Sequence, residues 1–173
     1  MSFTVRRIHD LGPRDLAGLC DVLIDCVEGG ASVSFMFPMT RAKAEGFWRG
    51  VGESVSRRER ALIVAEDERG IIGTAQAIWA TPENQPHRAD ISKMLVHRRA
   101  RRGGVGAAVL AAAESAAHEA GRTLLVLDTA SADAERLYER GGWRRVGTIP
   151  QYALLPAGPF CQTVVFYKDL TLR

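Results

Sequence analysis

The segment RRARRGGVG, residues 98–106, combines two features that a bound phosphate requires, positive charge and free backbone amides. Its four arginines can donate charge-assisted hydrogen bonds to phosphate oxygens. Its glycines let the backbone approach an anion closely, and the helix expected after them would direct unpaired N–H groups and a positive dipole to the same place. The segment predicts a phosphate-binding turn, with a tight turn among solvated arginines as the alternative.

Two widespread phosphate-binding motifs fit this turn poorly. A P-loop requires G-x-x-x-x-G-K-S/T, which the chain lacks. The dinucleotide-binding pattern G-x-G-x-x-G/A begins correctly at Gly104-Val105-Gly106, and Asp128 stands about where a ribose-binding acid would lie. Val109, however, occupies the place of the third glycine, and no further βαβ pattern precedes this unit. A dinucleotide site is therefore disfavoured.

Two carboxylates are candidates for proton transfer. Asp90 lies in the strand expected before the turn, and Asp128 ends the strand expected after the helix. Ligands of α/β sheets commonly bind at the carboxyl ends of strands, and a desolvated carboxylate there can acquire a pKa suited to a general base. Both acids stay candidates. His97 is disfavoured, because it adjoins the arginines and is expected to face solvent.

Hydrophobic patterning predicts the elements that position these groups, in the order β-α-α-β-β-β-α-β-α-β-β. Strands are expected at 3–8, 61–67, 71–80, 89–97, 123–128, 143–154 and 162–170, and helices at 13–27, 40–57, 105–120 and 131–140. Alternation over 89–97 predicts one face with Asp90, Ser92, Met94 and Val96 and another with Ile91, Lys93 and Leu95.

The predicted fold class is α/β (α+β), in a single domain over residues 1–173. The strand at 89–97, the helix at 105–120 and the strand at 123–128 form a central, right-handed parallel βαβ unit. The remaining strands follow one another as hairpins, so we expect a mixed, mostly antiparallel sheet with helices on both faces.

Two motifs in this framework resemble the GCN5-related N-acetyltransferases, the GNAT family. The pattern R/Q-x-x-G-x-G/A occurs as Arg101-Arg102-Gly103-Gly104-Val105-Gly106. The segment ASADAERLYERGGW is similar to the family's N-x-x-A-x-x-L-Y-x-x-x-G-F, with Ser131 in the asparagine's place. Because both motifs occur in the family's order among matching elements, the resemblance extends over about residues 3–170.

The resemblance implies that acetyl-CoA is the cosubstrate, its pyrophosphate bound by the turn and its pantetheine paired with the preceding strand. The implied cofactor-binding residues are Met94, Leu95, Val96, Arg101, Arg102, Gly103, Gly104, Val105, Gly106, Ala107 and Ser131. Tyr138 is implied to be the general acid for the leaving thiolate, with packing in the core as the alternative. The family's carboxylate base would be Asp90 or Asp128, either of which could instead bind the substrate ammonium or cap a loop.

The resemblance also places an acceptor site at the first two helices and the uncharged connection GGASVSFMFPM. Ser32, Phe35 and Met36 are the implied substrate-binding residues, with core packing as the alternative. The expected reaction is direct attack by the primary amine of a small molecule, such as an antibiotic or toxin, in a ternary complex. The alternatives are a non-catalytic acyl-CoA sensor and acetylation of a protein lysine or N-terminus.

Composition and charge bear on where the protein is located and which partners it has. No apolar run approaches the roughly 20 residues of a membrane span, and MSFTVRRIHDLG carries no secretory pattern, so we expect a cytoplasmic protein with no membrane partner. The three cysteines have no metal-ligand spacing, so no metal is expected. The net charge of +3 is modest and no recognition helix is evident, so no nucleic-acid partner is expected. A monomer or homodimer is expected.

Overall fold

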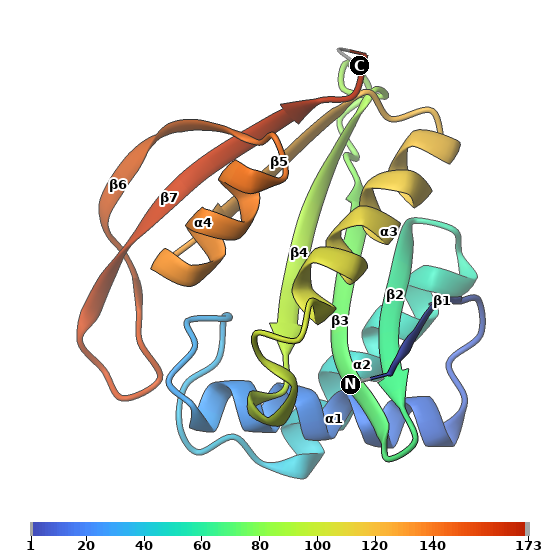
Figure 1. Ribbon diagram of the computed structural model, residues 1–173, viewed down its shortest axis with the longest axis vertical. Helices are drawn as coiled ribbons and strands as arrows, with labels where there is room; N and C mark the ends of the chain where they lie inside the picture. Colours follow the sequence, from blue (N-terminus) through green and yellow to red (C-terminus); the bar gives the residue numbers. More distant parts are fainter. Residues whose placement is uncertain (1, 172–173) are drawn as a thin grey trace.

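Residues 2–171, which the computed structural model describes, form one mixed sheet with helices on both faces (Figure 1). The strands are β1 (Thr4–Ile8), β2 (Arg60–Asp67), β3 (Gly70–Trp79), β4 (Arg88–Val96), β5 (Leu124–Thr129), β6 (Arg144–Leu154) and β7 (Phe160–Asp169). The helices are α1 (Pro13–Glu28), α2 (Arg41–Ser56), α3 (Val105–Glu119) and α4 (Ala132–Arg140), with a short 3-10 helix η1 (Arg98–Ala100). The predicted elements are all present in the predicted order; η1 was not expected, because three residues are too few to show periodicity.

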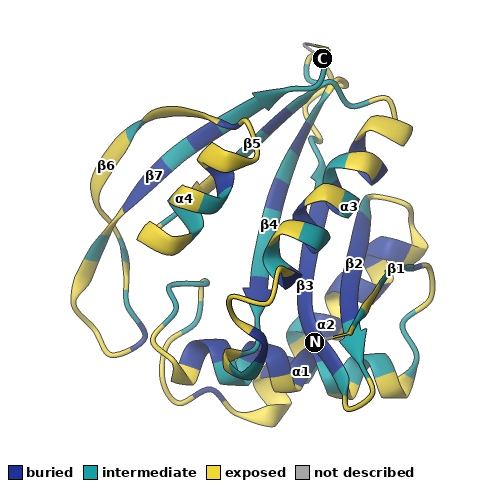
Figure 2. Cartoon of the chain, viewed as in Figure 1, coloured by how far each residue is buried: buried dark blue, intermediate teal, exposed yellow. Residues whose placement is uncertain are grey.

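The sheet runs β1-β2-β3-β4-β5-β7-β6, and its neighbouring strands are antiparallel except for β4 and β5. The predicted mixed, mostly antiparallel sheet with one parallel unit is therefore confirmed. α1 and α2 bury their apolar faces against one side of the sheet, and α3 and α4 pack on the other (Figure 2). Small side chains on α3, such as Ala113 and Ala117, let this helix lie close to β2 and β3.

Glycine at position 73 brings the beginning of α3 against the sheet. A Cβ atom on Gly73 would lie 2.6 Å from Val105 Cγ1, well inside ordinary van der Waals contact. Only a residue without a side chain lets the first turn of α3 pack on β3 at this position. Gly73 of β3 thereby sets how closely the turn before α3 can approach the sheet.

A β-bulge in β4 overturns the predicted alternation of this strand. Gln76 of β3 pairs with Ser92 and Thr74 pairs with Leu95, so two residues of β4, Lys93 and Met94, stand opposite one of β3. Lys93 adopts a left-handed conformation with φ 51°. The extra residue shifts the phase of the strand by one.

The phase shift changes which β4 side chains share a face. Ile91 and Met94 pack with the α3 side of the core, whereas Leu95 packs with the α1–α2 side. Lys93 also faces α2, because its ammonium lies over the Phe47 ring. The predicted grouping of Met94 and Val96 with Asp90, and of Ile91 with Lys93, is therefore wrong.

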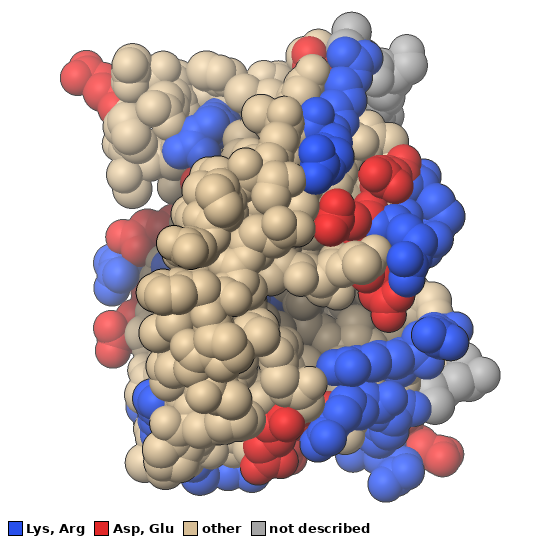
Figure 3. All heavy atoms as spheres, turned by 90° about the vertical axis from the view of Figure 1, so that its left-hand side faces the viewer, with Lys and Arg blue, Asp and Glu red and all other residues tan. Residues whose placement is uncertain are grey.

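The hairpin of β6 and β7 forms an edge of the sheet with few neighbours. Its exposed large hydrophobic residues are Val146, Ile149, Tyr152, Leu154 and Phe160. Figure 3 views the molecule from this side and shows a broad surface without charge, with Lys and Arg side chains gathered toward its margins. An exposed apolar sheet edge is a common place for protein association. If the chain forms the homodimer that was one of the two expected states, this hairpin is the first surface to test for the contact.

Candidate active site

The parallel pair at the centre of the sheet separates after a short paired stretch. β4 and β5 pair only over Arg88–Asp90 and Leu124–Val126, although β4 continues to Val96 and β5 to Thr129. We call the diverging segments, 91–96 and 127–129, the β4–β5 fork (Figure 1). The edge of β4 that faces the fork has no strand partner among residues 2–171, which leaves backbone groups there available to an extended ligand. Val96 O is an exception, because it accepts hydrogen bonds from Cys26 Sγ and Arg101 Nε. Met94, Leu95 and Val96, the predicted coenzyme-binding residues of this strand, lie on this segment of β4.

The turn before α3 presents a continuous series of free amides. The first backbone hydrogen bond of the helix runs from Ala108 N to Gly104 O at 3.1 Å. Across the described part of the chain, no acceptor is found for the N–H groups of residues 102–107. Gly104, with φ +83°, makes the left-handed turn that a residue with a Cβ atom would resist. Six unpaired donors at a helix N-terminus form the environment that phosphate oxygens prefer.

The four arginines of this segment divide into two pairs with different surroundings. Arg98 donates from Nε to Asp25 Oδ1 at 2.8 Å, and Arg99 donates from both terminal nitrogens to Asp67. These two arginines fasten η1 to α1 and β2, so they are already engaged. Arg101 donates from Nε to Val96 O at 3.4 Å, and the Arg102 side chain has no hydrogen-bond or ion-pair partner within residues 2–171. Arg101 and Arg102 are therefore the arginines left for a phosphate.

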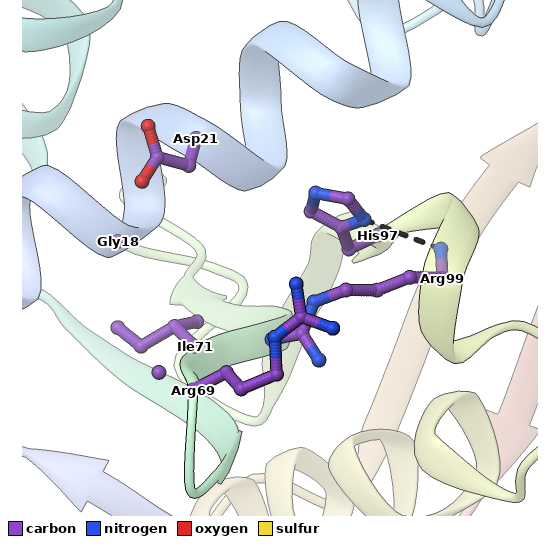
Figure 4. Close-up of a pocket in the computed structure, with 7 residues that line it drawn as sticks. Gly18, Asp21, Arg69, Ile71, His97 and Arg99 are labelled. Atoms are coloured by element: carbon purple, nitrogen blue, oxygen red, sulfur yellow. Dashed lines mark hydrogen bonds between the residues drawn. The ribbon is translucent and has the colours of Figure 1, made fainter.

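A pocket of about 140 Å³, separate from the β4–β5 fork and from the turn at 102–107, lies between η1 and α1 (Figure 4). It is lined by Gly18, Asp21, Arg69, Gly70, Ile71, His97 and Arg99. The His97 side chain is 26% exposed, and its Nδ1 accepts a hydrogen bond from Arg99 N at 3.2 Å. His97 is thus only partly exposed to solvent, and its Nδ1 lies 3.5 Å from Asp25 Oδ2 of α1. None of the predicted site residues lines this pocket.

Asp128 lies in the β4–β5 fork and is held by β7. Thr163 Oγ1 donates to Asp128 Oδ2 at 2.7 Å, and Thr163 is buried. Leu125 and Leu127 belong to the α3 side of the core, so alternation places Asp128 on the α1–α2 side of β5. This is the side that Lys93 also occupies.

Lys93 approaches the same region from β4. Its Nζ donates to Ser34 Oγ at 3.1 Å and lies 5.7 Å from the centre of the Phe47 ring. Burial lowers the pKa of Lys93, and the nearby Asp128 carboxylate acts in the opposite direction. The sequence pattern did not single out Lys93 as a site residue. The available signal was a lysine inside an otherwise apolar strand segment.

Asp90, the other candidate base, has a different environment. It pairs with Arg88, whose Nη1 lies 2.5 Å from Asp90 Oδ1. Exposure does not distinguish the two carboxylates, because Asp128 is an exposed residue and Asp90 is half-buried. Asp90 also stands opposite Val126, where β4 and β5 are still paired. The structure thus places only one of the two predicted carboxylates, Asp128, in the fork.

Tyr138 is both a core residue and a neighbour of Asp128. Its ring is 3% exposed and packs against Trp143 and Phe166, with ring centres 5.9 and 5.8 Å away. Burial, with a smaller contribution from the Asp128 carboxylate, raises the pKa of Tyr138. Packing in the core and a position close to the fork are therefore compatible for this side chain. Ser131 caps α4, because its Oγ accepts a hydrogen bond from Ala134 N at 3.4 Å.

The connection between α1 and α2 reaches across to the β6–β7 hairpin. Ser32 Oγ accepts a hydrogen bond from Cys161 Sγ at 3.5 Å and lies 3.5 Å from Leu154 O. The Phe35 and Phe47 rings pack edge to face with their centres 5.2 Å apart, and the Met36 side chain is partly exposed. Together with Ser34 on Lys93, these contacts place the predicted acceptor segment beside the fork.

Comparison with known proteins agrees with this geometry. Residues 58–145 match the family model described as an acetyltransferase (GNAT) domain. The chain belongs to the GNAT family. A relative from Azospirillum brasilense, named as an uncharacterized N-acetyltransferase in the hisH-hisA intergenic region, is 33% identical over 127 residues, which cover 72% of this chain and 74% of that one. The predicted family and the predicted acetyltransferase class are confirmed.

Solved structures of acetyltransferases share the fold over nearly the whole chain. A ribosomal-protein-alanine N-acetyltransferase from Brucella melitensis superimposes with a TM-score of 0.79 at 24% identity, covering 96% of this chain and 99% of that one. A phosphinothricin acetyltransferase from Sinorhizobium meliloti, solved in complex with acetyl-CoA, gives 0.80 at 20% identity, covering 98% and 89%. Within residues 2–171, the helices lack the combination of length and apolarity needed to cross a membrane.

Proposed function

We propose that this protein transfers the acetyl group of acetyl-CoA to the primary amine of a small molecule, by direct attack within a ternary complex. The observation that carries the proposal is the series of free amides at 102–107, at the end of a strand whose neighbouring edge is also unpaired. A polyanionic group joined to an extended amide-bearing chain, as in coenzyme A, complements both features. We propose the whole chain as one domain that works without a metal ion, in the cytoplasm.

For the donor, the amides of 102–107 bind the pyrophosphate with help from Arg101 and Arg102, whose guanidinium groups are not held by carboxylates. Met94 and Leu95 offer backbone groups to the pantetheine and the thioester carbonyl. A donor aimed at the developing oxyanion contributes about 2.7–4 kcal/mol to catalysis. Ser131, at the beginning of α4, completes the proposed coenzyme contacts.

For the chemistry, Asp128 is the proposed base. The acceptor enters as an ammonium ion, Asp128 takes one proton, and the neutral nitrogen attacks the thioester carbon. The tetrahedral intermediate collapses with cleavage of the C–S bond, and the thiolate takes a proton from Tyr138. The nitrogen gives its second proton to solvent, solvent returns a proton to Tyr138, and Asp128 releases the first proton before the next turnover. A phenol is protonated at neutral pH even at its ordinary pKa, so Tyr138 has a proton to donate; burial, which raises the pKa of Tyr138, makes it a weaker acid. Asp90, ion-paired with Arg88, is the less suitable base.

Calorimetric titration with coenzyme A, followed by an acceptor panel read by free thiol release, tests the proposal. We expect coenzyme A to bind and some small primary amines to release thiol. Binding without thiol release from small amines, peptides or proteins would instead identify an acyl-CoA sensor, and turnover confined to peptides or proteins would identify the alternative acceptor class. Failure to bind at millimolar coenzyme A would refute the donor assignment.

A further inference from the structure

We infer that the acceptor is zwitterionic: beside the amine that is acetylated it carries a carboxylate, which Lys93 and Gln76 bind. This inference rests on the proposed function, since it concerns the acceptor of the same transfer. It follows from two groups on the β3–β4 part of the site that have no anionic partner within residues 2–171, the Lys93 ammonium and the Gln76 amide N–H. It also follows from the Asp128 carboxylate, which lies across the fork on β5 and on the same face of the sheet.

The Lys93 ammonium is partly buried without a counter-ion. It has three hydrogen-bond donors, of which one reaches the neutral hydroxyl of Ser34 at 3.1 Å. No carboxylate among residues 2–171 forms an ion pair with it. The Phe47 ring on its other side supplies only a weak attraction. A cation in such a position gains free energy when an anion occupies the remaining directions.

Gln76 provides a second unsatisfied hydrogen-bond donor on the α1–α2 face of the sheet, the face that Lys93 occupies. Its side chain is fully buried, and its Oε1 accepts a hydrogen bond from Arg60 Nη1 at 2.7 Å. That bond fixes the orientation of the amide, so Nε2 is the free end, and it has no acceptor within residues 2–171. Gln76 pairs in register with Ser92, the residue before Lys93, and cross-strand partners share a face of the sheet. A buried donor without an acceptor is costly, which points to a ligand oxygen here.

Charge around Lys93 fits an anion with a neighbouring ammonium group. Arg60 and Asp128 are the charged groups that act on Lys93. Arg60 adds positive potential behind Gln76, whereas Asp128 is negative and is fixed by Thr163 without forming an ion pair with Lys93. Opposite charges that share a face without meeting are complementary to a zwitterion. Its ammonium group would lie at Asp128, where the proton is removed, and its carboxylate at Lys93.

The test compares amines that differ only in the carboxylate. Glycine and the L-amino acids that carry a primary α-amine are assayed as acceptors beside their primary amides and their decarboxylated amines, with the wild type, Lys93→Met, Lys93→Arg and Arg49→Met. Arg49 lies on the exposed face of α2, so Arg49→Met is a control for the loss of one positive charge. Melting temperature and the coenzyme A dissociation constant are measured for every variant.

We expect wild type to prefer an amino acid to its amide by at least about tenfold in kcat/KM, as one charge-assisted contact provides. Lys93→Met removes that preference mainly by raising KM, Lys93→Arg restores part of it, and Arg49→Met retains it. Equal activity of wild type toward acids and amides, or an equal loss with both in Lys93→Met, would overturn the inference while leaving acetyl transfer in place. Coenzyme A binding without turnover of any amine would instead reject the proposed function.

Discussion

Replacement of Gly73 by alanine tests whether one close approach between β3 and α3 sets the position of the coenzyme turn. The new Cβ would stand 2.6 Å from Val105 Cγ1, whereas carbon atoms prefer about 3.5–4.0 Å, so the two atoms must separate by about 1 Å. Val105 is buried and supplies one of the free amides of the turn. The strain therefore acts on the residue that we propose to contact the pyrophosphate.

Overpacking of this kind typically costs about 1–3 kcal/mol. For a chain of this length, about 2–4 °C of melting temperature corresponds to each kcal/mol, so Gly73→Ala should melt several degrees lower than wild type. We also expect weaker coenzyme A binding, by about tenfold if 1.4 kcal/mol of the strain appears in the complex. Differential scanning calorimetry and isothermal titration measure the two effects on the same samples.

A double-mutant cycle separates this clash from a general effect of alanine. Val105→Ala removes Cγ1, so Gly73→Ala combined with Val105→Ala should be more stable than the sum of the single changes predicts. Gly46 on α2 is the matched control, because a Cβ atom there would meet no neighbour within 4 Å. The reasoning is refuted if Gly73→Ala behaves like Gly46→Ala, or if the two effects at positions 73 and 105 are additive.

Three further predictions concern single charges and protons. Asp128→Asn should lower kcat by about 10²–10⁴-fold and abolish the acidic limb of the pH–rate profile, whereas Asp90→Asn should change kcat only a few-fold. Tyr138→Phe should lower kcat at saturating acetyl-CoA while leaving the coenzyme A dissociation constant unchanged, because the ring keeps its packing. Arg99 holds the pKa of Asp67 at about 2, below its ordinary value, so the stabilisation from this pair is present above about pH 4 and is lost as pH falls toward 2. Asp67→Asn should accordingly lower the melting temperature at pH 6 and converge with wild type near pH 2.

Each of these has a contrary result. A larger effect of Asp90→Asn than of Asp128→Asn would exchange the two carboxylates in the mechanism. Unchanged turnover in Tyr138→Phe would leave this side chain as a core residue only. A constant difference in melting temperature between wild type and Asp67→Asn from pH 6 to pH 2 would show that the pair with Arg99 does not stabilise the folded chain.

The fold was largely predictable because its elements are marked locally. Pro13 begins α1, Thr40 caps α2, and the alternation of apolar residues distinguishes strands from helices. The phosphate-binding turn was predictable for the same reason, since glycines and arginines are contiguous there. The partners of the arginines were not, because Arg98 meets Asp25 and Arg99 meets Asp67, far away in the sequence. Sequence spacing could not show that only two of the four arginines at 98–102, Arg101 and Arg102, are without a carboxylate partner within residues 2–171.

The choice between Asp90 and Asp128 also depends on information that no local pattern contains. Both occur in strands that pair in parallel, and both were equal candidates by composition. What distinguishes them is where the pairing stops: β4 and β5 are joined at Asp90 and Val126 and have separated at Asp128. Where this pairing ends is a property of the assembled sheet, in which β5 also pairs with β7 and packs in the core with residues of α3 and α4.

The β4 bulge explains why the same reasoning missed Lys93. Strict alternation would put Lys93 on the face of Ile91, under α3, where the core consists of alanine and other apolar side chains. An ammonium group would have no partner there, and its burial would cost several kcal/mol. One inserted residue avoids this cost by turning Lys93 toward Phe47 and Ser34 while Met94 takes the apolar side. Deleting Met94 would restore the alternation and direct the lysine into the core, so we infer that the bulge is the structural condition for a positive charge beside the fork.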